Sequence, residues 1–354
     1  MAIVTRQPRA HRWRDRQSPP GACLPGDSAA DDDTTFLSVA ARWSRWLALG
    51  TVVVAAGSMP WLPASTAPTT LVVAGLFFAA GVPHGAIDHL MASRLTGGRS
   101  IPLVAAAYAG LAAAAWALMT WVGPVALLLI VALSALHFGL GELEISRQLT
   151  GWQPRPILAA AIVVAGCGSL LLPLARSGEQ IRTVASAVSP DVALLIGTAW
   201  MQVGLVAAWV GAAVVALTSA LRSGHRTVAL DIVLIGLLGA LAPPLVAFAV
   251  WFGGWHALRH CARMLTVEPG CAKLVATGRR VAAVRRFAGL AAVPSIAALT
   301  VVAGLAWFTV VAPDPTTVVA EVLRLLLALT VPHMVVVLWL DRSAARRQPA
   351  LSTR

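Results

Sequence analysis

The feature that most constrains this chain is a series of apolar runs, each about twenty residues long, that recurs between residues 44 and 340. A helix of about twenty residues spans the hydrocarbon core of a bilayer, because each residue adds about 1.5 Å. Only 12% of the residues are charged and the mean hydropathy is +0.78, whereas about a quarter of a soluble chain is charged. The sequence therefore predicts an all-α, polytopic transmembrane helical bundle and excludes a soluble globular protein.

We place about ten spans on the chain, within a range of eight to ten. The seventh is short and runs into Pro243 and Pro244, so it forms with the eighth either one broken helix or a tight hairpin. Residues 1–43 are expected to be a disordered basic and acidic cytoplasmic tail, and residues 342–354 a cytoplasmic C-terminal tail. The spans cover approximately residues 44–63, 70–92, 101–121, 125–145, 156–175, 192–220, 228–242, 244–264, 288–311 and 318–340, within a transmembrane domain at 44–341.

Basic residues predict the orientation of these spans, since short cytoplasmic loops of membrane proteins retain Lys and Arg. With the N-terminus inside, the loops expected in the cytoplasm contain thirteen basic residues, whereas the external loops contain only Arg176 and Arg182. We therefore expect an even number of spans, both termini in the cytoplasm, and a multi-pass protein of the cell (inner or plasma) membrane. The net charge of +12 then orients the chain in the lipid bilayer and does not indicate nucleic-acid binding.

Histidines are concentrated in the apolar spans. Ionisable side chains inside a membrane are costly and usually mark a functional site. Measured from the nearest cytoplasmic arginines at about 1.5 Å per residue, four histidines on different spans (His84, His137, His256 and His333) lie about 10 to 15 Å deep. A shared layer is what a metal centre between helices requires. Six of the eight histidines lie within spans, namely His84, His89, His137, His256, His260 and His333.

Spacing indicates which of these rings can share one ion. His256 and His260 are four residues apart and project from one helix face. His84 and His89 are five apart, about 140° round a helix, so only one of them is expected to be a direct ligand. Asp88 either accepts a hydrogen bond from a ligand imidazole, which fixes the tautomer of that ring, or pairs with a basic group such as Arg94.

Other side chains near the histidines allow two interpretations each. Glu142 is either a hydrogen-bonding partner of the site or an interfacial residue. Aromatic residues near the histidines either line an apolar substrate channel or pack at the membrane interface; they include Phe138, Trp251, Phe252 and Trp255.

The chemistry that remains is metal-centred. Nucleophile constellations and phosphate-cradling loops are absent from the sequence, and the single lysine, Lys273, lies in a loop. Imidazole ligands suit Fe, Zn, Cu or Ni, so the residues alone do not name the metal. The sequence indicates a metal site that acts on a lipid-soluble compound, with no catalytic residue expected beyond the metal ligands.

Four segments in this order resemble the Brp/Blh family of membrane beta-carotene 15,15'-dioxygenases: GVPHGAIDH (81–89), LHFGLGE (136–142), FGGWHALRH (252–260) and VPHM (331–334). The resemblance covers about residues 70–340. It implies an iron-dependent oxygenase that splits the central double bond of beta-carotene with O2 and gives two molecules of all-trans-retinal. Such enzymes commonly supply chromophore to microbial rhodopsins, so the resemblance also implies a functional link to a rhodopsin.

The resemblance also implies a ligand set. The positions that match the family's motifs are His84, His137, His256 and His260, which would hold Fe²⁺. His89 and His333 then join Asp88 and Glu142 as residues that support the ligands or line the pocket.

Three alternatives stay open at this stage. One is an oxygenase of this kind that acts on a different carotenoid or apocarotenoid, or a family member that keeps the iron site only for binding. A histidine-box desaturase or hydroxylase needs about eight or more histidines for two metals, whereas only WHALRH here has the HxxxH form. A metal transporter usually pairs acidic residues at mid-membrane, and only Asp88 and Asp231 are candidates.

Overall fold

The computed structural model describes residues 27–58, 67–176, 179–310 and 315–347, and these residues form helices and no strand. This confirms the all-α fold class. The helical elements of the described residues are α1 (Asp27–Ser58), α2 (Ala67–Gly81), η2 (Val82–His84), α3 (Asp88–Leu95), α4 (Ile101–Trp121), α5 (Pro124–Thr150), α6 (Pro156–Gly166), α7 (Gly168–Arg176), α8 (Glu179–Val188), α9 (Pro190–Ile196), α10 (Ala199–Arg222), α11 (Arg226–Leu241), α12 (Pro244–Ala249), η3 (Val250–Ala257), α13 (Leu258–Val267), α14 (Pro269–Ala276), α15 (Arg280–Val310) and α16 (Pro315–Arg347).

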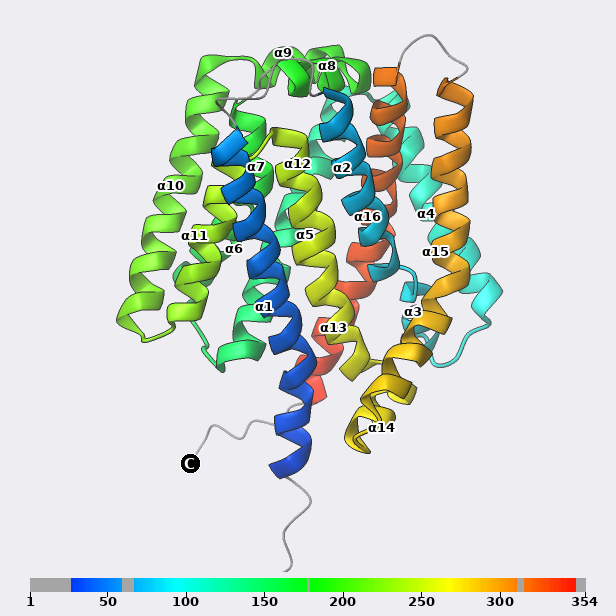
Figure 1. Cartoon of the computed structure of the whole chain (residues 1–354). Coiled ribbons are helices and arrows are strands. Elements are labelled where there is room, and N and C mark those ends of the chain that lie inside the picture. The colour runs from blue at the N-terminus through cyan, green and yellow to red at the C-terminus, as the bar shows by residue number, and fades with distance from the viewer. Residues whose placement is uncertain (1–26, 59–66, 177–178, 311–314, 348–354) are drawn as a thin grey trace, which may run out of the picture.

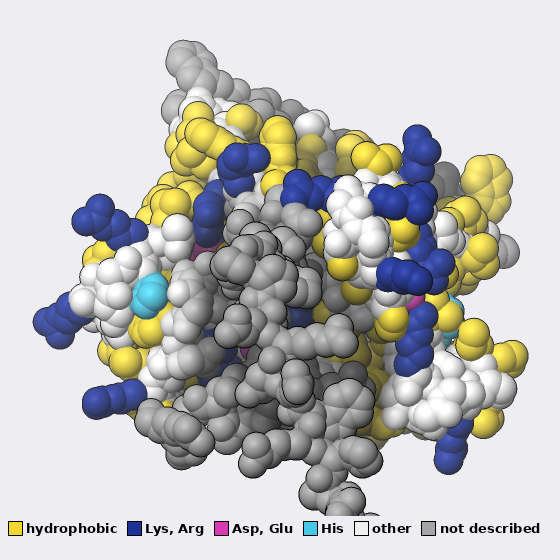
Figure 2. Space-filling view, turned by 90° about the horizontal axis from the view of Figure 1, so that it is seen from below, with side chains coloured by type: hydrophobic (Ala, Val, Ile, Leu, Met, Phe, Trp, Pro, Cys, Tyr) yellow, Lys and Arg dark blue, Asp and Glu magenta, His cyan; other side chains and the backbone are white. Residues whose placement is uncertain are grey.

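The long helices run between two ends of a single bundle (Figure 1). α1 rises from the lower end, α2 descends, and the direction alternates along the chain until α16 returns to the lower end. α8 and α9 lie across the upper end, and α14 lies at the lower end. Seen from below, the lower end carries many basic side chains (Figure 2). The start of α1 and the end of α16 therefore both lie on the basic side of the bundle.

Six described helices are long and apolar enough to cross a membrane, and α6 with α7 makes a seventh if that pair, bent by 53°, is one span. This is fewer than the ten spans expected. α11 has only 16 residues, and the segment from Pro244 to Val267 is divided among α12, η3 and α13. The six are Thr69–Leu95, Ile101–Trp121, Pro124–Thr150, Ala199–Arg222, Arg280–Gly304 and Ala320–Ser343.

The first helix begins earlier than the boundary at residue 43 that we expected. Residues 1–26 of the expected tail lie outside the described residues, but α1 already begins at Asp27. Leu37 and Ala40 of α1 are buried against Ile145 and Ala262. Burial of these apolar side chains stabilises a helix whose sequence alone is too polar to predict it. At the C-terminal end, α16 continues to Arg347, past residue 342, where the tail was expected to begin.

Prolines and glycines break two of the expected spans and separate two others. The 70–92 span is interrupted at η2, which contains Pro83, and helix resumes only at Asp88. The 192–220 span is interrupted after α9, where Gly197 follows the last helical residue. Pro243 lies between the end of α11 and the start of α12, which run in opposite directions (Figure 1). Of the two alternatives for this region, the structure contains the tight hairpin.

Candidate metal centre

A π-helical segment, η3, lies in the middle of the helix that begins at Pro244. A π-helix has a wider turn than an α-helix; it is rare and frequently occurs at functional sites. All eight residues of η3 are buried. A Cβ added to Gly253 would overlap the backbone oxygen of Phe77, so η3 approaches α2 backbone to backbone. The segment carries His256, and His260 follows in α13 with its ring stacked at 6.2 Å from that of His256.

Five histidine rings gather beside η3. They come from η2, α5, η3, α13 and α16, and the pairwise ring contacts have centroid distances between 4.7 and 6.2 Å. All four histidines proposed as ligands are among them, and the fifth is His333. The ring of His333 lies 4.7 Å from that of His84, 4.9 Å from that of His137 and 5.3 Å from that of His260.

The free nitrogens of these rings fit a metal ion. His84 Nδ1 lies 2.5 Å from the carbonyl oxygen of Gly81, which leaves its Nε2 for another partner. The Nε2 atoms of the other four rings are buried and have no hydrogen-bond partner among the described residues. A buried polar atom without a partner costs about 1 to 3 kcal/mol, and a shared cation removes that cost. One donor atom each of His84, His256 and His333 lies within 4.8 Å of the others.

Asp88 supports one of these rings. Its Oδ2 accepts a hydrogen bond from His333 Nδ1 at 2.7 Å and another from the Tyr108 hydroxyl at 3.0 Å. Asp88 was expected either to orient a histidine or to pair with Arg94. In the structure Arg94 instead donates to Glu268 at 2.7 Å, and Asp88 orients His333.

His89 and Glu142 do not join the ring cluster within the described residues. His89 is half-buried in α3, and none of the ring contacts of that part of the chain includes it. Glu142 accepts hydrogen bonds from Trp255 Nε1 at 2.9 Å and from Arg259 Nη1 at 3.3 Å. Its carboxylate therefore supports η3 and α13 rather than a histidine ring.

A buried network of charges continues from Glu142 to α1. Arg259 Nη1 also lies 3.1 Å from Asp231 Oδ2, and Asp231 in turn accepts from Arg45 at 2.6 Å. The network pairs two arginines with two carboxylates, so it is neutral as a whole. Breaking such a pair leaves an uncompensated buried charge. The network fixes α13, and with it His260, against α1, α5 and α11.

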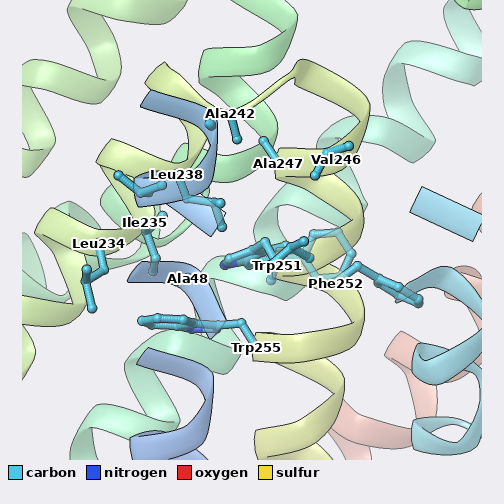
Figure 3. Close-up of a cluster of buried hydrophobic side chains, with 14 residues drawn as sticks. Ala48, Leu234, Ile235, Leu238, Ala242, Val246, Ala247, Trp251, Phe252 and Trp255 are labelled. Carbon is cyan, nitrogen blue, oxygen red and sulfur yellow. The ribbon is translucent and has the colours of Figure 1, made fainter. Parts of the chain in front are cut away.

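The aromatic side chains expected to line a channel divide into two groups. Trp251 and Trp255 are fully buried and point toward Ala48 and Ile235, whereas Phe252 points the other way (Figure 3). Trp255 also lies under the guanidinium of Arg259, at 3.7 Å. The tryptophans thus belong to the packed core between η3, α1 and α11. Phe252 and Phe138 instead face a cavity.

The cavity is apolar and has a volume of about 200 Å³. Its walls come from α2, α5, α7, α8, α9, α12, η3 and α16, so α8 and α9 cover it at the upper end. Phe138 and Phe252 lie between this cavity and the histidines: the Phe138 ring is 4.9 Å from His256 and the Phe252 ring 5.2 Å from His84. The rings of Phe138 and Phe252 therefore separate an apolar chamber from the histidine cluster.

A second, smaller hollow borders His137, His256 and His260. It also reaches Arg263 and Asp341, which form an ion pair. Because Asp341 lies near the end of α16, this hollow approaches the cluster from the lower end of the bundle.

Sequence reasoning missed Tyr108 and the charge network. Tyr108 is the only tyrosine in the chain, and a single phenol in an apolar span was the available signal. In the sequence, Arg259 counts only among the basic residues expected on the cytoplasmic side, and nothing singles out Arg45. Their pairing with Asp231 depends on which helices are neighbours, and no local pattern encodes that.

Comparisons with known proteins agree with the histidine segments. A sequence profile described as beta-carotene 15,15'-dioxygenase matches residues 75–341. The chain is 32% identical over 325 residues to the probable beta-carotene 15,15'-dioxygenase Blh of Halobacterium salinarum, a match that covers 84% of this chain and 92% of that protein. It is 26% identical over 190 residues to the beta-carotene 15,15'-dioxygenase of uncultured marine bacterium 66A03, covering 51% of this chain and 64% of that protein. No solved structure matches the chain significantly. Since the profile spans most of the chain, the chain belongs to the beta-carotene 15,15'-dioxygenase family.

Proposed function

We propose that this protein cleaves beta-carotene at its central 15,15' double bond with O2, using Fe²⁺ bound by His84, His137, His256 and His260, and releases two molecules of all-trans-retinal. The observation that carries the proposal is an apolar cavity next to a cluster of buried histidines with free nitrogens, with only the rings of Phe138 and Phe252 between them. The names of the relatives support the substrate class.

The reaction balances without a further reductant. The central C=C bond and the O=O bond break, two C=O bonds form, and each aldehyde receives one atom of O2. Fe²⁺ bound there would supply the activation of O2. The residues of the chain then hold the polyene and exclude water, which protects reactive species from hydrolysis.

Positioning is the main task of the protein in this proposal. The cavity walls are almost entirely Leu, Val, Ile, Phe and Pro side chains, which suit a hydrocarbon. Phe138 and Phe252 stand between the cavity and the rings, where they would hold the middle of the polyene against the metal centre. A rigid polyene held at this point is cleaved centrally.

We also propose that the chain crosses the cell membrane ten times with both termini in the cytoplasm. The alternating helix directions and the basic lower end support this topology (Figures 1 and 2). Exposed Val, Leu, Ile and Trp side chains on the bundle, such as Val54 and Trp307, suit contact with lipid. Single cysteines test it in a background in which Cys23, Cys167, Cys261 and Cys271 are all replaced by Ser. Ser223→Cys should react only with a membrane-permeant maleimide, and Ser186→Cys also with an impermeant one.

Expression in a bacterial host that accumulates beta-carotene tests the activity. We expect loss of colour, formation of retinal, and one ¹⁸O atom in each retinal when the cells receive ¹⁸O2. His256→Ala should abolish cleavage, and the matched control His225→Ala, whose ring stacks on Trp152 outside the cluster, should retain it. Longer aldehydes in place of retinal would instead indicate another cleavage position.

Metal analysis of the purified protein tests the cofactor. One iron per chain is expected, and its removal by a chelator should abolish activity until Fe²⁺ is returned. Two irons per chain would favour a desaturase-like centre, and full activity without iron would reject the proposal.

A further inference from the structure

His333 was expected only to support the ligands or line the pocket, but its ring lies within the cluster. Its ring contacts three of the four proposed ligand rings. Its donor atom lies within 4.8 Å of donor atoms of both His84 and His256. Two nitrogens on opposite sides of one ion are about 4.2 Å apart when each metal–nitrogen bond is about 2.1 Å. An ion held by His84 and His256 would therefore lie beside the donor atom of His333.

The two nitrogens of His333 have different environments. Nδ1 donates to Asp88 Oδ2 at 2.7 Å, which leaves Nε2 unprotonated in a neutral ring. Nε2 is buried and has no hydrogen-bond partner among the described residues. A histidine that served packing alone would be expected to satisfy both nitrogens. A carboxylate on one nitrogen and a free second nitrogen is the arrangement that metal-binding histidines adopt.

Three helices hold this arrangement in place. Asp88 comes from the first turn of α3, Tyr108 from α4 and His333 from α16. The Tyr108 hydroxyl donates to the same carboxylate oxygen as His333, at 3.0 Å. A Cβ added to Gly85 would lie 3.4 Å from that oxygen and 3.5 Å from His333 Nδ1, at ordinary contact distance, so the backbone after η2 packs against the pair.

We propose that His333 is a fifth ligand of the metal centre through Nε2, and that Asp88 and Tyr108 are positioning residues that fix its ring. The inference rests on the proposed function, because it adds a ligand to the same centre. Five imidazoles on a six-coordinate ion leave a single open position. The polyene needs no coordination to the metal, so one open position suffices for O2.

Cobalt titration tests the ligand directly. Full-length protein purified in detergent and stripped with a chelator is titrated with CoCl2, and the visible d–d absorption reports the coordination number of the ion. His333→Asn is the main variant, since its amide can still donate to Asp88 but has no atom at the position of Nε2. We expect at least a tenfold loss of Co²⁺ affinity and a more intense d–d spectrum, because the coordination number falls. His333→Ala should show the same loss of affinity and the same spectrum as His333→Asn, and imidazole added to His333→Ala should restore the wild-type spectrum.

The positioning residues are tested in the same titration. Asp88→Asn should weaken Co²⁺ binding about 10- to 100-fold, as loss of such carboxylates does elsewhere, and Tyr108→Phe should weaken it less. His225→Ala is the control, since the His225 ring stacks on Trp152 outside the cluster, and it should bind Co²⁺ as wild type does. Equal thermal unfolding of the metal-free proteins would show that the variants fold.

The outcomes separate this inference from the proposed function. If His256→Ala loses Co²⁺ binding while His333→Asn keeps the wild-type affinity and spectrum, His333 is not a ligand and the four-histidine centre stands. If the wild-type protein binds no Co²⁺, or His256→Ala binds it normally, the proposed centre itself is wrong.

Discussion

The guanidinium of Arg259 lies 3.7 Å above the indole ring of Trp255. It also forms ion pairs with both Glu142 and Asp231. The side chain of Arg259 is only 1% exposed. The π-helical segment that carries His256 is thus joined to α5 and α11 by one buried cation. A membrane protein bears the cost of burying these charges only where they are paired.

Replacement of Arg259 by Leu should therefore destabilise the protein by about 3 to 5 kcal/mol, because it leaves two buried carboxylates with one arginine. Thermal and denaturant unfolding in detergent measure the effect. The exposed Arg222→Leu serves as the control and should change stability little. The double variant Arg259→Leu, Glu142→Gln restores neutrality and should recover part of the loss; an unfolding midpoint unchanged in the single variant would contradict the network's role.

Gly253→Ala should weaken the packing of η3 on α2. The new Cβ overlaps the backbone oxygen of Phe77, and a backbone atom cannot rotate away. Overpacking of this kind costs about 1 to 3 kcal/mol, and the displaced η3 should also lower metal affinity. Gly211→Ala in α10 is the matched control, since no atom lies within 4 Å of its added Cβ. Equal unfolding midpoints and equal metal content in both variants would show that the contact is loose.

Filling the apolar cavity should impair substrate binding without affecting the metal. Leu174 lines the cavity, and Leu174→Trp should reduce retinal formation at least tenfold while iron content stays at the wild-type level. Leu194→Trp places the same bulk on a residue that is 74% exposed, and it should retain activity. Wild-type turnover in Leu174→Trp would mean that the polyene binds elsewhere.

Glu268 should make stability depend on pH at the lower end of the bundle. Burial by itself raises the pKa of this carboxyl, but hydrogen bonds from Arg286, Arg94 and Cys271 outweigh burial and hold the pKa well below its usual range. A group whose pKa is lower in the folded state stabilises the fold above the ordinary carboxyl pKa of about 4.3, and that stabilisation is lost as pH falls toward the folded-state pKa.

Glu268→Gln should thus lower the free energy of unfolding at pH 7 by about 1.5 to 3 kcal/mol, the usual worth of a hydrogen bond to a charged group. The gap between variant and wild type should narrow as pH falls below about 4. Thermal unfolding from pH 7 to pH 3 measures it. Glu144→Gln, at a half-exposed carboxylate, should cost under about 1 kcal/mol. If the difference in unfolding free energy between Glu268→Gln and wild type did not change with pH, the pKa of Glu268 would not be lowered in the folded protein.

The sequence by itself determined the helical class, the positions of most helices and the residues able to bind metal. These properties are local: runs of apolar residues set helix length, and prolines and glycines set the breaks. The i,i+4 spacing of His256 and His260 likewise follows from helix geometry alone. Even the estimate that histidines of separate helices share one layer needed only the rise per residue and the nearest arginines.

Only the tertiary structure decided how each helix is rotated about its axis. A helix that is apolar all round carries no pattern that tells which face meets a neighbour. For that reason the sequence did not reveal that His333 lies among the other rings, that it is the partner of Asp88, or that Trp255 faces Arg259 while Phe252 faces the cavity. These choices depend on close packing between segments far apart in the chain, such as Gly253 against Phe77, and they set the geometry of the metal centre.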